Sequence, residues 1–135
     1  EMGRRAHMYR KIGEEFIADD FAHEQSVVFE TGKGLVIFNS CSHGGIVNIV
    51  REVQMALGGQ KVYAVVGGFH MMKLSGMDTL AIPEEEVVET AQELKGLGVE
   101  EIYTGHCTGN IAFRILKKEL GEMVHALGTG ETVIF

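Results

Sequence analysis

The segment that most constrains the fold is a short, nearly continuous apolar run, GLVIFNS at residues 34–40. A run of this length is far too short to span a bilayer and is typical of a central strand that is covered on both faces. A second β-branched run, SVVFET at residues 26–31, precedes it, and Gly32-Lys33 between the two predicts a hairpin. A strand covered on both faces requires layers above and below it, so the segment predicts an α/β layered domain.

Three amphipathic helices are expected after this hairpin. The first ends at Gly58-Gly59, in the way that helix C-termini prefer. The second begins at Pro83, and the three glutamates that follow complement its N-terminal dipole. The third runs from about Gly109 to Leu120. The apolar positions expected to face the core are Ile46, Ile49, Val50, Val53 and Leu57 in the first helix, Val87, Ala91 and Leu94 in the second, and Ile111, Ile115 and Leu116 in the third.

Strand-like runs at residues 61–68 and 100–105 separate the helices, and residues 71–82 are expected to form a loop. The segments MVHAL and TVIF predict a final hairpin around GTGE at residues 128–131. The expected order is β-β-α-β-α-β-α-β-β, a mixed sheet with about three helices. Residues 1–22 are interpreted as an N-terminal arm with one short strand at residues 15–18, and residues 23–135 as the α/β domain.

Charge and cysteine content restrict the partners and the compartment. The chain has 19 acidic and 12 basic residues and a net charge of -7, which argues against binding to nucleic acid or to an anionic membrane surface. A small-molecule substrate is the expected partner. The two cysteines, Cys41 and Cys107, cannot form a framework of bridges and fit a cytoplasmic, reducing setting. The opening residues show no signal-peptide pattern.

The candidate site consists of three histidines, each of which follows a predicted strand. His43 follows GLVIFNS, His70 follows KVYAVVGGF and His106 follows EEIYTG. Functional groups in α/β sheets gather beyond the carboxyl ends of the strands, so the three side chains are expected at one edge. Neutral imidazole is a common ligand of zinc, and a catalytic zinc takes about three protein ligands and leaves one position open. The pattern therefore predicts a metal site.

Other interpretations of the same residues remain open. A single histidine at a strand end usually makes a structural hydrogen bond, and a free cysteine is usually a small buried apolar residue. Thiol catalysis by Cys107 beside His106 is a further possibility, although neighbouring residues on a strand point in opposite directions. The glycine-rich turns form neither GxGxxG nor a phosphate-binding P-loop motif.

The blocks SCSHGG at residues 40–45, GGFH at residues 67–70 and HCTG at residues 106–109 closely resemble the metallo-β-lactamase superfamily. Within it, the resemblance is to the branch of dihydropterin-type synthases. It implies that the chain is the C-terminal half of the domain, one βα half of an αββα sandwich with a metal site at one edge. The motif HxHxDH of the N-terminal half does not occur in this chain. The implied enzyme is a metal-dependent hydrolase that is complete only with that other half.

The resemblance also implies roles for individual residues. His106 matches the late histidine ligand, and Cys41 stands where many relatives have a bridging aspartate, with His43 two residues further on as the alternative ligand. His70 is expected to be a catalytic residue that lines the site. Ser42, Thr108 and Gly109 are expected to bind an anionic group of the substrate, the last two at the start of a helix. The expected cofactor is a divalent metal, zinc in the first place, with iron or manganese as alternatives.

Two functions follow from these expectations. In the first, metal-activated water attacks an ester, an amide or a phosphoester of a small molecule. In the second, the chain is a non-catalytic fragment or subunit, because half a sandwich leaves one sheet face uncovered. That face would be covered by the N-terminal half of the domain or by self-association.

Overall fold

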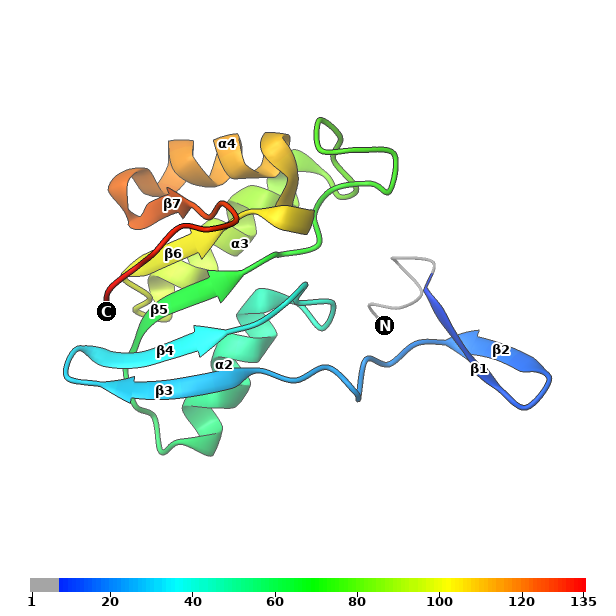
Figure 1. Ribbon diagram of the computed structural model, residues 1–135, viewed down its shortest axis with the longest axis horizontal. Helices are drawn as coiled ribbons and strands as arrows, with labels where there is room; N and C mark the ends of the chain where they lie inside the picture. Colours follow the sequence, from blue (N-terminus) through cyan, green and yellow to red (C-terminus); the bar gives the residue numbers. More distant parts are fainter. Residues whose placement is uncertain (1–7) are drawn as a thin grey trace.

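A computed structural model describes residues 8–135 of the chain, and its centre is a five-stranded sheet in the order β3-β4-β5-β6-β7. The strands β3 and β4 are antiparallel, and β4 to β7 are mutually parallel. The helices α2, α3 and α4 cover one face of the sheet (Figure 1). The elements of this body are β3 Val27–Thr31, β4 Gly34–Phe38, α2 Ile46–Ala56, β5 Val62–Gly67, α3 Glu84–Gly96, β6 Glu101–Thr104, α4 Gly109–Leu120 and β7 Val124–Ala126.

The predicted order of elements is confirmed up to β7, but the predicted final hairpin is wrong. Residues 124–126 of the MVHAL segment form a parallel edge strand beside β6, and residues 132–135 form no strand. The turn at residues 128–131 is closed by the Glu131 carboxylate, which accepts a hydrogen bond from the Gly128 amide. The tail instead places the Phe135 ring edge-on against Phe38 and Tyr103. Apolar burial against the sheet therefore replaces strand pairing at this end.

The helices bury the faces that their periodicity predicts, with one shift. Val87, Ala91 and Leu94 of α3 are fully buried, as expected. In α4 the predicted apolar stripe is rotated. Ile111 and Ile115 are only partly buried, and the buried side chains are Ala112, Leu116 and Leu120. This side of α4 packs against α3 and β7, where the small Ala112 allows close approach.

The two faces of the sheet differ in how far they are covered. The helix-covered face contributes Leu35, Ile37, Val65 and Ile102 to the main core, and all four are fully buried. The opposite face, here called the open face, has a smaller cluster in which Val36, Ala64 and Val66 are buried. At its β3 end, Val27 and Phe29 are each 56% exposed.

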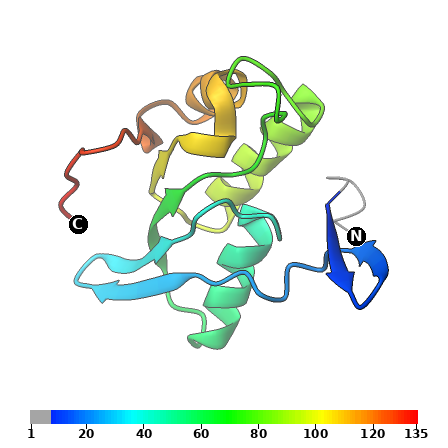
Figure 2. The same ribbon diagram turned by 45° about the vertical axis from the view of Figure 1, so that its right-hand side comes forward.

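A second, two-stranded sheet stands apart from this body. It pairs β1 (Tyr9–Ile12) with β2 (Glu15–Ala18), and it projects from the molecule ahead of β3 (Figure 2). The predicted strand at residues 15–18 is confirmed, whereas its partner has no clean alternation and was missed. The first seven residues of the predicted arm lie outside the described residues, and the boundary at residue 22 stays a prediction. No helix in the described part of the chain is long and apolar enough to cross a membrane.

Candidate metal centre at the carboxyl edge of the sheet

The parallel strands β4, β5 and β6 end at the same edge of the sheet, and each is followed by a turn with a residue in the left-handed region. Those residues are Ser42, His70 and His106, with φ of 54°, 51° and 49°. Residues other than glycine rarely adopt this conformation, and such strain gathers at functional sites. The sequence placed a histidine after each strand, and the structure shows that the backbone turns sharply at or beside all three.

A cluster of sulfur and nitrogen donors lies at this edge. The candidate ligand atoms of Cys41, His106 and Cys107 all lie within 4.8 Å of one another. His106 is exposed, Cys41 is partly buried and Cys107 is buried. The structure thus brings together Cys41 and His106, two of the predicted metal ligands, and adds Cys107 beside them. In the described residues, His43 is not part of this cluster.

The Cys107 thiol is buried and packs against the turns at the ends of the parallel strands. Its Sγ accepts a hydrogen bond from the His70 amide at 3.2 Å and donates one to the Cys41 carbonyl at 3.7 Å. A Cβ added at Gly68 would lie 2.6 Å from this sulfur, so only glycine fits there. Burial raises the pKa of the Cys107 thiol to about 12. A thiol held in its protonated form is a poor nucleophile, which argues against thiol catalysis.

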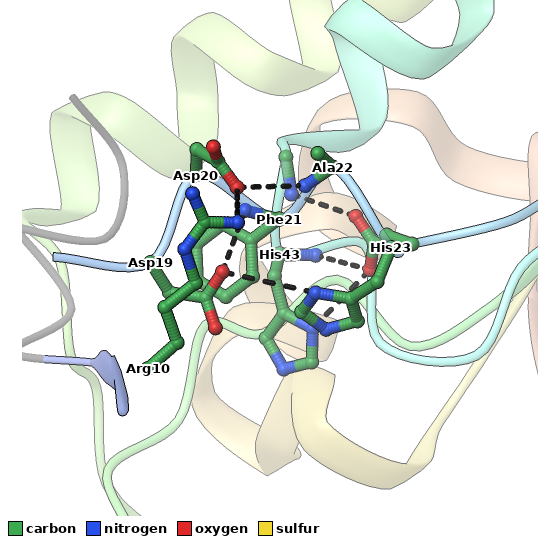
Figure 3. Close-up of polar contacts among 9 residues, drawn as sticks. Arg10, Asp19, Asp20, Phe21, Ala22, His23 and His43 are labelled. Carbon is green, nitrogen blue, oxygen red and sulfur yellow. Dashed lines mark hydrogen bonds and ion pairs between the residues drawn. The ribbon is translucent and has the colours of Figure 1, made fainter. Parts of the chain in front are cut away.

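His43 and His70 form a separate pair next to the donor cluster. Their ring centroids are 4.5 Å apart. The Phe21 ring stacks on the His43 ring, with centroids 5.0 Å apart and an interplanar angle of 13° (Figure 3). Glu24 binds the same loop: its carboxylate lies 3.2 Å from the His43 Nδ1 atom. Sequence reasoning missed Glu24 and Phe21, because both precede the first strand of the sheet and neither belongs to a recognisable motif.

The His70 imidazole favours its neutral form. Burial lowers its pKa below the usual 6.5, the neighbouring His43 lowers it further, and Glu24 acts in the opposite direction. A neutral imidazole keeps a lone pair that can accept a proton or bind a metal. His70 is therefore suited chemically to the predicted catalytic role, which stays a prediction.

Thr108 and Gly109 make structural contacts at the start of α4. The Thr108 hydroxyl accepts a hydrogen bond from the Phe69 amide at 2.9 Å and pairs with the Thr104 hydroxyl at 2.6 Å. A Cβ added at Gly109 would meet the Met72 side chain at 2.7 Å, so residues 71–82 cover this turn closely. The predicted anion-binding role of both residues stays a prediction, and their observed contacts are structural.

Ser42 differs from these residues because its hydroxyl is buried without a partner. The residue is 2% exposed, and its Oγ atom has no hydrogen-bond partner among the described residues. The Asn39 Nδ2 atom, at the end of the same strand, is in the same condition. Since buried polar groups are nearly always paired, the predicted role of Ser42 in binding substrate is compatible with its position.

The donor set fits a divalent metal in part. Thiolate and imidazole are ligands that zinc and similar ions prefer. Cys41 and His106 are both accessible from the edge, whereas Cys107 is buried and protonated. A catalytic metal takes about three protein ligands and an open position, so these residues supply a portion of one coordination shell.

No protein-family model matches the sequence. The chain is 36% identical over 128 residues to the 7,8-dihydropterin-6-methyl-4-(beta-D-ribofuranosyl)-aminobenzene-5'-phosphate synthase of Methanocaldococcus jannaschii, a match that covers 95% of this chain and 41% of that protein. The fold of this chain is similar to the crystal structure of a metal-dependent hydrolase of the beta-lactamase superfamily, with a TM-score of 0.82 and 30% sequence identity. The match covers 94% of this chain and 46% of that protein.

The chain spans less than half the length of each of these two proteins. Its five-stranded mixed sheet with three helices matches one half of a beta-lactamase-like fold, and the predicted fold class is confirmed. The resemblance read from the SCSHGG, GGFH and HCTG blocks is confirmed as well. In sequence the chain is therefore similar to a dihydropterin-type synthase, and in fold it is similar to one half of a metal-dependent hydrolase of the beta-lactamase superfamily.

Proposed function

We propose that this chain supplies Cys41 and His106 as ligands to the metal centre of a metal-dependent hydrolase. The observation that carries the proposal is the cluster of Cys41, His106 and Cys107 at the carboxyl edge of the sheet, with ligand atoms within 4.8 Å. The fold match to a metal-dependent hydrolase supports a divalent metal in general. Zinc is the proposed ion, because it accepts both thiolate and imidazole. A reducing compartment such as the cytoplasm would keep the thiols available.

The remaining residues of the edge have separate tasks in this proposal. His70 accepts or donates a proton at the substrate, because the lowered pKa of its half-buried imidazole favours the neutral form. The Ser42 hydroxyl, buried and unpartnered among the described residues, donates a hydrogen bond to an anionic group of the substrate. A bound divalent metal would act as a Lewis acid that activates water for attack on an ester, amide or phosphoester. The name of the Methanocaldococcus jannaschii relative's product contains a phosphate, so a phosphorylated small molecule is the first substrate class to test.

Cobalt(II) titration of the full chain tests the ligand assignment directly. Thiolate ligation to this metal produces a charge-transfer band in the near ultraviolet, so a band is expected with the wild-type chain. Replacing Cys41→Ser removes the band, while Cys107→Ala keeps it, because the Cys107 sulfur is buried and hydrogen-bonded to the His70 amide and the Cys41 carbonyl. His106→Asn weakens cobalt binding without removing the thiolate band at saturation. Absence of any such band in the wild-type chain at saturating cobalt would contradict the proposal.

The second candidate function is that of a non-catalytic half that requires a partner half. It is favoured by one observation: Val27 and Phe29 on the open face are each 56% exposed. An apolar sheet face left bare promotes association. The partner would be the HxHxDH-bearing half of the domain, and self-association is the competing outcome.

Size-exclusion chromatography distinguishes these outcomes. The chain is run alone, and then with an equimolar amount of the N-terminal half of a superfamily relative. A complex that forms only in the mixture, and that is lost when Phe29→Asp is introduced, supports a partner half. A dimer of the chain alone that is lost in the same variant supports self-association. Hydrolysis in the mixture but not in either half separates the enzymatic function from the non-catalytic one.

A further inference from the structure

The carboxylate of Glu24 is bound by the loop that follows β4. Its Oε1 atom accepts a hydrogen bond from the His43 amide at 2.7 Å, and its Oε2 atom accepts one from the Gly44 amide at 2.8 Å. The same Oε1 atom lies 3.2 Å from Nδ1 of the His43 ring. One carboxylate therefore holds both the backbone of the loop and the side chain of a candidate site residue.

This arrangement favours one position for the ring proton of His43. An ionised carboxylate can only accept hydrogen bonds, so the Oε1 atom 3.2 Å from Nδ1 favours the form in which Nδ1 carries the proton. In a neutral imidazole only one nitrogen is protonated, which leaves the Nε2 atom with a free lone pair. Histidines that bind metals or transfer protons are oriented in the same way, by a carboxylate on the second nitrogen.

The ring of His43 also contacts two other rings. Phe21 stacks on it nearly in parallel, and His70 lies against it at a tilt of 59°. The segment that carries Phe21 is folded by its own hydrogen bonds: Asp19 accepts from the Phe21 amide and Asp20 accepts from the Ala22 amide (Figure 3). His43 therefore has little freedom to rotate away from Glu24.

The contact differs from the ion pairs on the surface of the chain. The side chain of Glu24 is 11% exposed and that of His43 is 25% exposed, whereas Arg51 and Glu93 are 50% and 44% exposed. Exposed pairs contribute little because water competes for them. A shielded carboxylate that accepts two backbone hydrogen bonds and lies 3.2 Å from a ring nitrogen is a defined positioning contact.

We propose that Glu24 is the positioning residue that fixes the tautomer and orientation of His43, so that its Nε2 lone pair is presented beside His70 at the carboxyl edge. Glu24 acts through His43 and does not itself touch the substrate. The inference deepens the proposed function, since it equips His43 to serve as a ligand or a proton acceptor. The contact itself concerns only residues of this chain and does not depend on metal.

Nitrogen-15 NMR of the chain labelled at histidine measures the tautomer directly, without metal and without activity. The spectrum of a His43→Gln variant identifies the His43 signals among those of the six histidines. In the wild-type chain at neutral pH, His43 is expected to show a protonated Nδ1 and an unprotonated Nε2. In Glu24→Ala this single-tautomer pattern is lost, and the two signals move toward each other as the tautomers exchange.

Two further variants make the outcome decisive. Glu24→Gln preserves the size of the side chain and removes its charge, so it reports the tautomer even when Glu24→Ala does not fold. The matched control is Asp20→Asn, which alters a carboxylate of the same segment that contacts Arg10 and not His43. Loss of the pattern in the Glu24 variants alone supports the positioning role. A wild-type His43 that carries its proton on Nε2, or an unchanged pattern in folded Glu24→Gln and Glu24→Ala, overturns it.

Discussion

The two flanks of the carboxyl edge are built in different ways. On the β5–β6 flank, the two buried hydroxyls are paired: the Thr104 hydroxyl donates to the Gly67 carbonyl at 2.7 Å and pairs with the Thr108 hydroxyl at 2.6 Å. On the β4 flank, two buried polar atoms, Asn39 Nδ2 and Ser42 Oγ, have no partner among the described residues. The first flank is self-contained, whereas the second depends on groups from elsewhere.

The difference shows which part of the site this chain completes. A buried polar group without a partner costs free energy, so such groups are rare and mark places where a ligand or another part of the protein binds. The β4 flank is held by Glu24, which reaches it from the segment before β3. The two unpaired groups of the β4 flank are therefore available for a contact that the described residues do not provide.

The largest effect is expected from Gly68→Ala, which breaks the self-contained flank. The added methyl group would lie 2.6 Å from the Cys107 sulfur and 3.0 Å from the Ser40 carbonyl oxygen. Overpacking of this kind should lower the free energy of unfolding by about 3 kcal/mol, and urea denaturation measures this loss. The control is Gly96→Ala, at an exposed position with no atom within 4 Å of the new methyl group. Equal stability of the two variants would show that the packing between Gly68 and the Cys107 sulfur can accommodate a methyl group.

The next effect is expected from Thr104→Val, which keeps the shape of the side chain and removes its hydroxyl. The partly buried Gly67 carbonyl and the fully buried Thr108 hydroxyl each lose a partner. The free energy of unfolding should fall by about 2 kcal/mol. Thr90→Val is the matched control, because the Thr90 hydroxyl bonds a carbonyl within a half-buried helix turn. A loss no greater than that of the control would contradict the self-contained flank.

Ser42→Ala tests the other flank, again by removing a hydroxyl. Its effect on the free energy of unfolding should have the opposite sign to that of Thr104→Val. The Ser42 hydroxyl is buried and has no partner among the described residues, so its removal eliminates a desolvation cost. The free energy of unfolding of the chain should rise by about 1 kcal/mol or less. Differential scanning calorimetry of Ser42→Ala and Thr104→Val side by side measures the contrast. A destabilised Ser42→Ala would mean that the hydroxyl has a partner, and that both flanks are complete.

Strands β3 to β6 and the histidines that follow β4, β5 and β6 were predictable, because local periodicity decides these strands. The buried face of α3, Val87, Ala91 and Leu94, follows from spacing alone and is confirmed. The grouping of Cys41 with His106 followed from parallel strands that end at one edge. These features depend on neighbours within a few residues or on a general rule of sheet topology.

The features that were missed depend on contacts between distant parts of the chain. Glu24 reaches His43 across 19 positions, and no spacing rule connects an acidic residue in a loop with a later strand end. The tail at residues 132–135 has the composition of a strand, but its Phe135 ring packs against Phe38 and Tyr103 instead. In both cases tertiary packing decides the outcome, and local propensity does not.

The smallest expected effect concerns His70, which joins the two flanks. Its amide donates to Cys107 on one flank, and its ring lies against His43 on the other. Burial, followed by the effect of His43, lowers the pKa of His70 below the usual 6.5, so the unfolded chain binds more protons than the folded one just below pH 6.5. The stability that His70 contributes is therefore fully present above pH 6.5 and is lost as the pH falls through the folded pKa. Urea unfolding of the metal-free chain above and below pH 6.5 measures how steeply the free energy of unfolding changes with pH. This pH dependence should be weaker in His70→Gln. His23→Gln controls for the loss of an exposed histidine. An equally weakened pH dependence in that variant would show that His70 makes no special contribution between the two flanks.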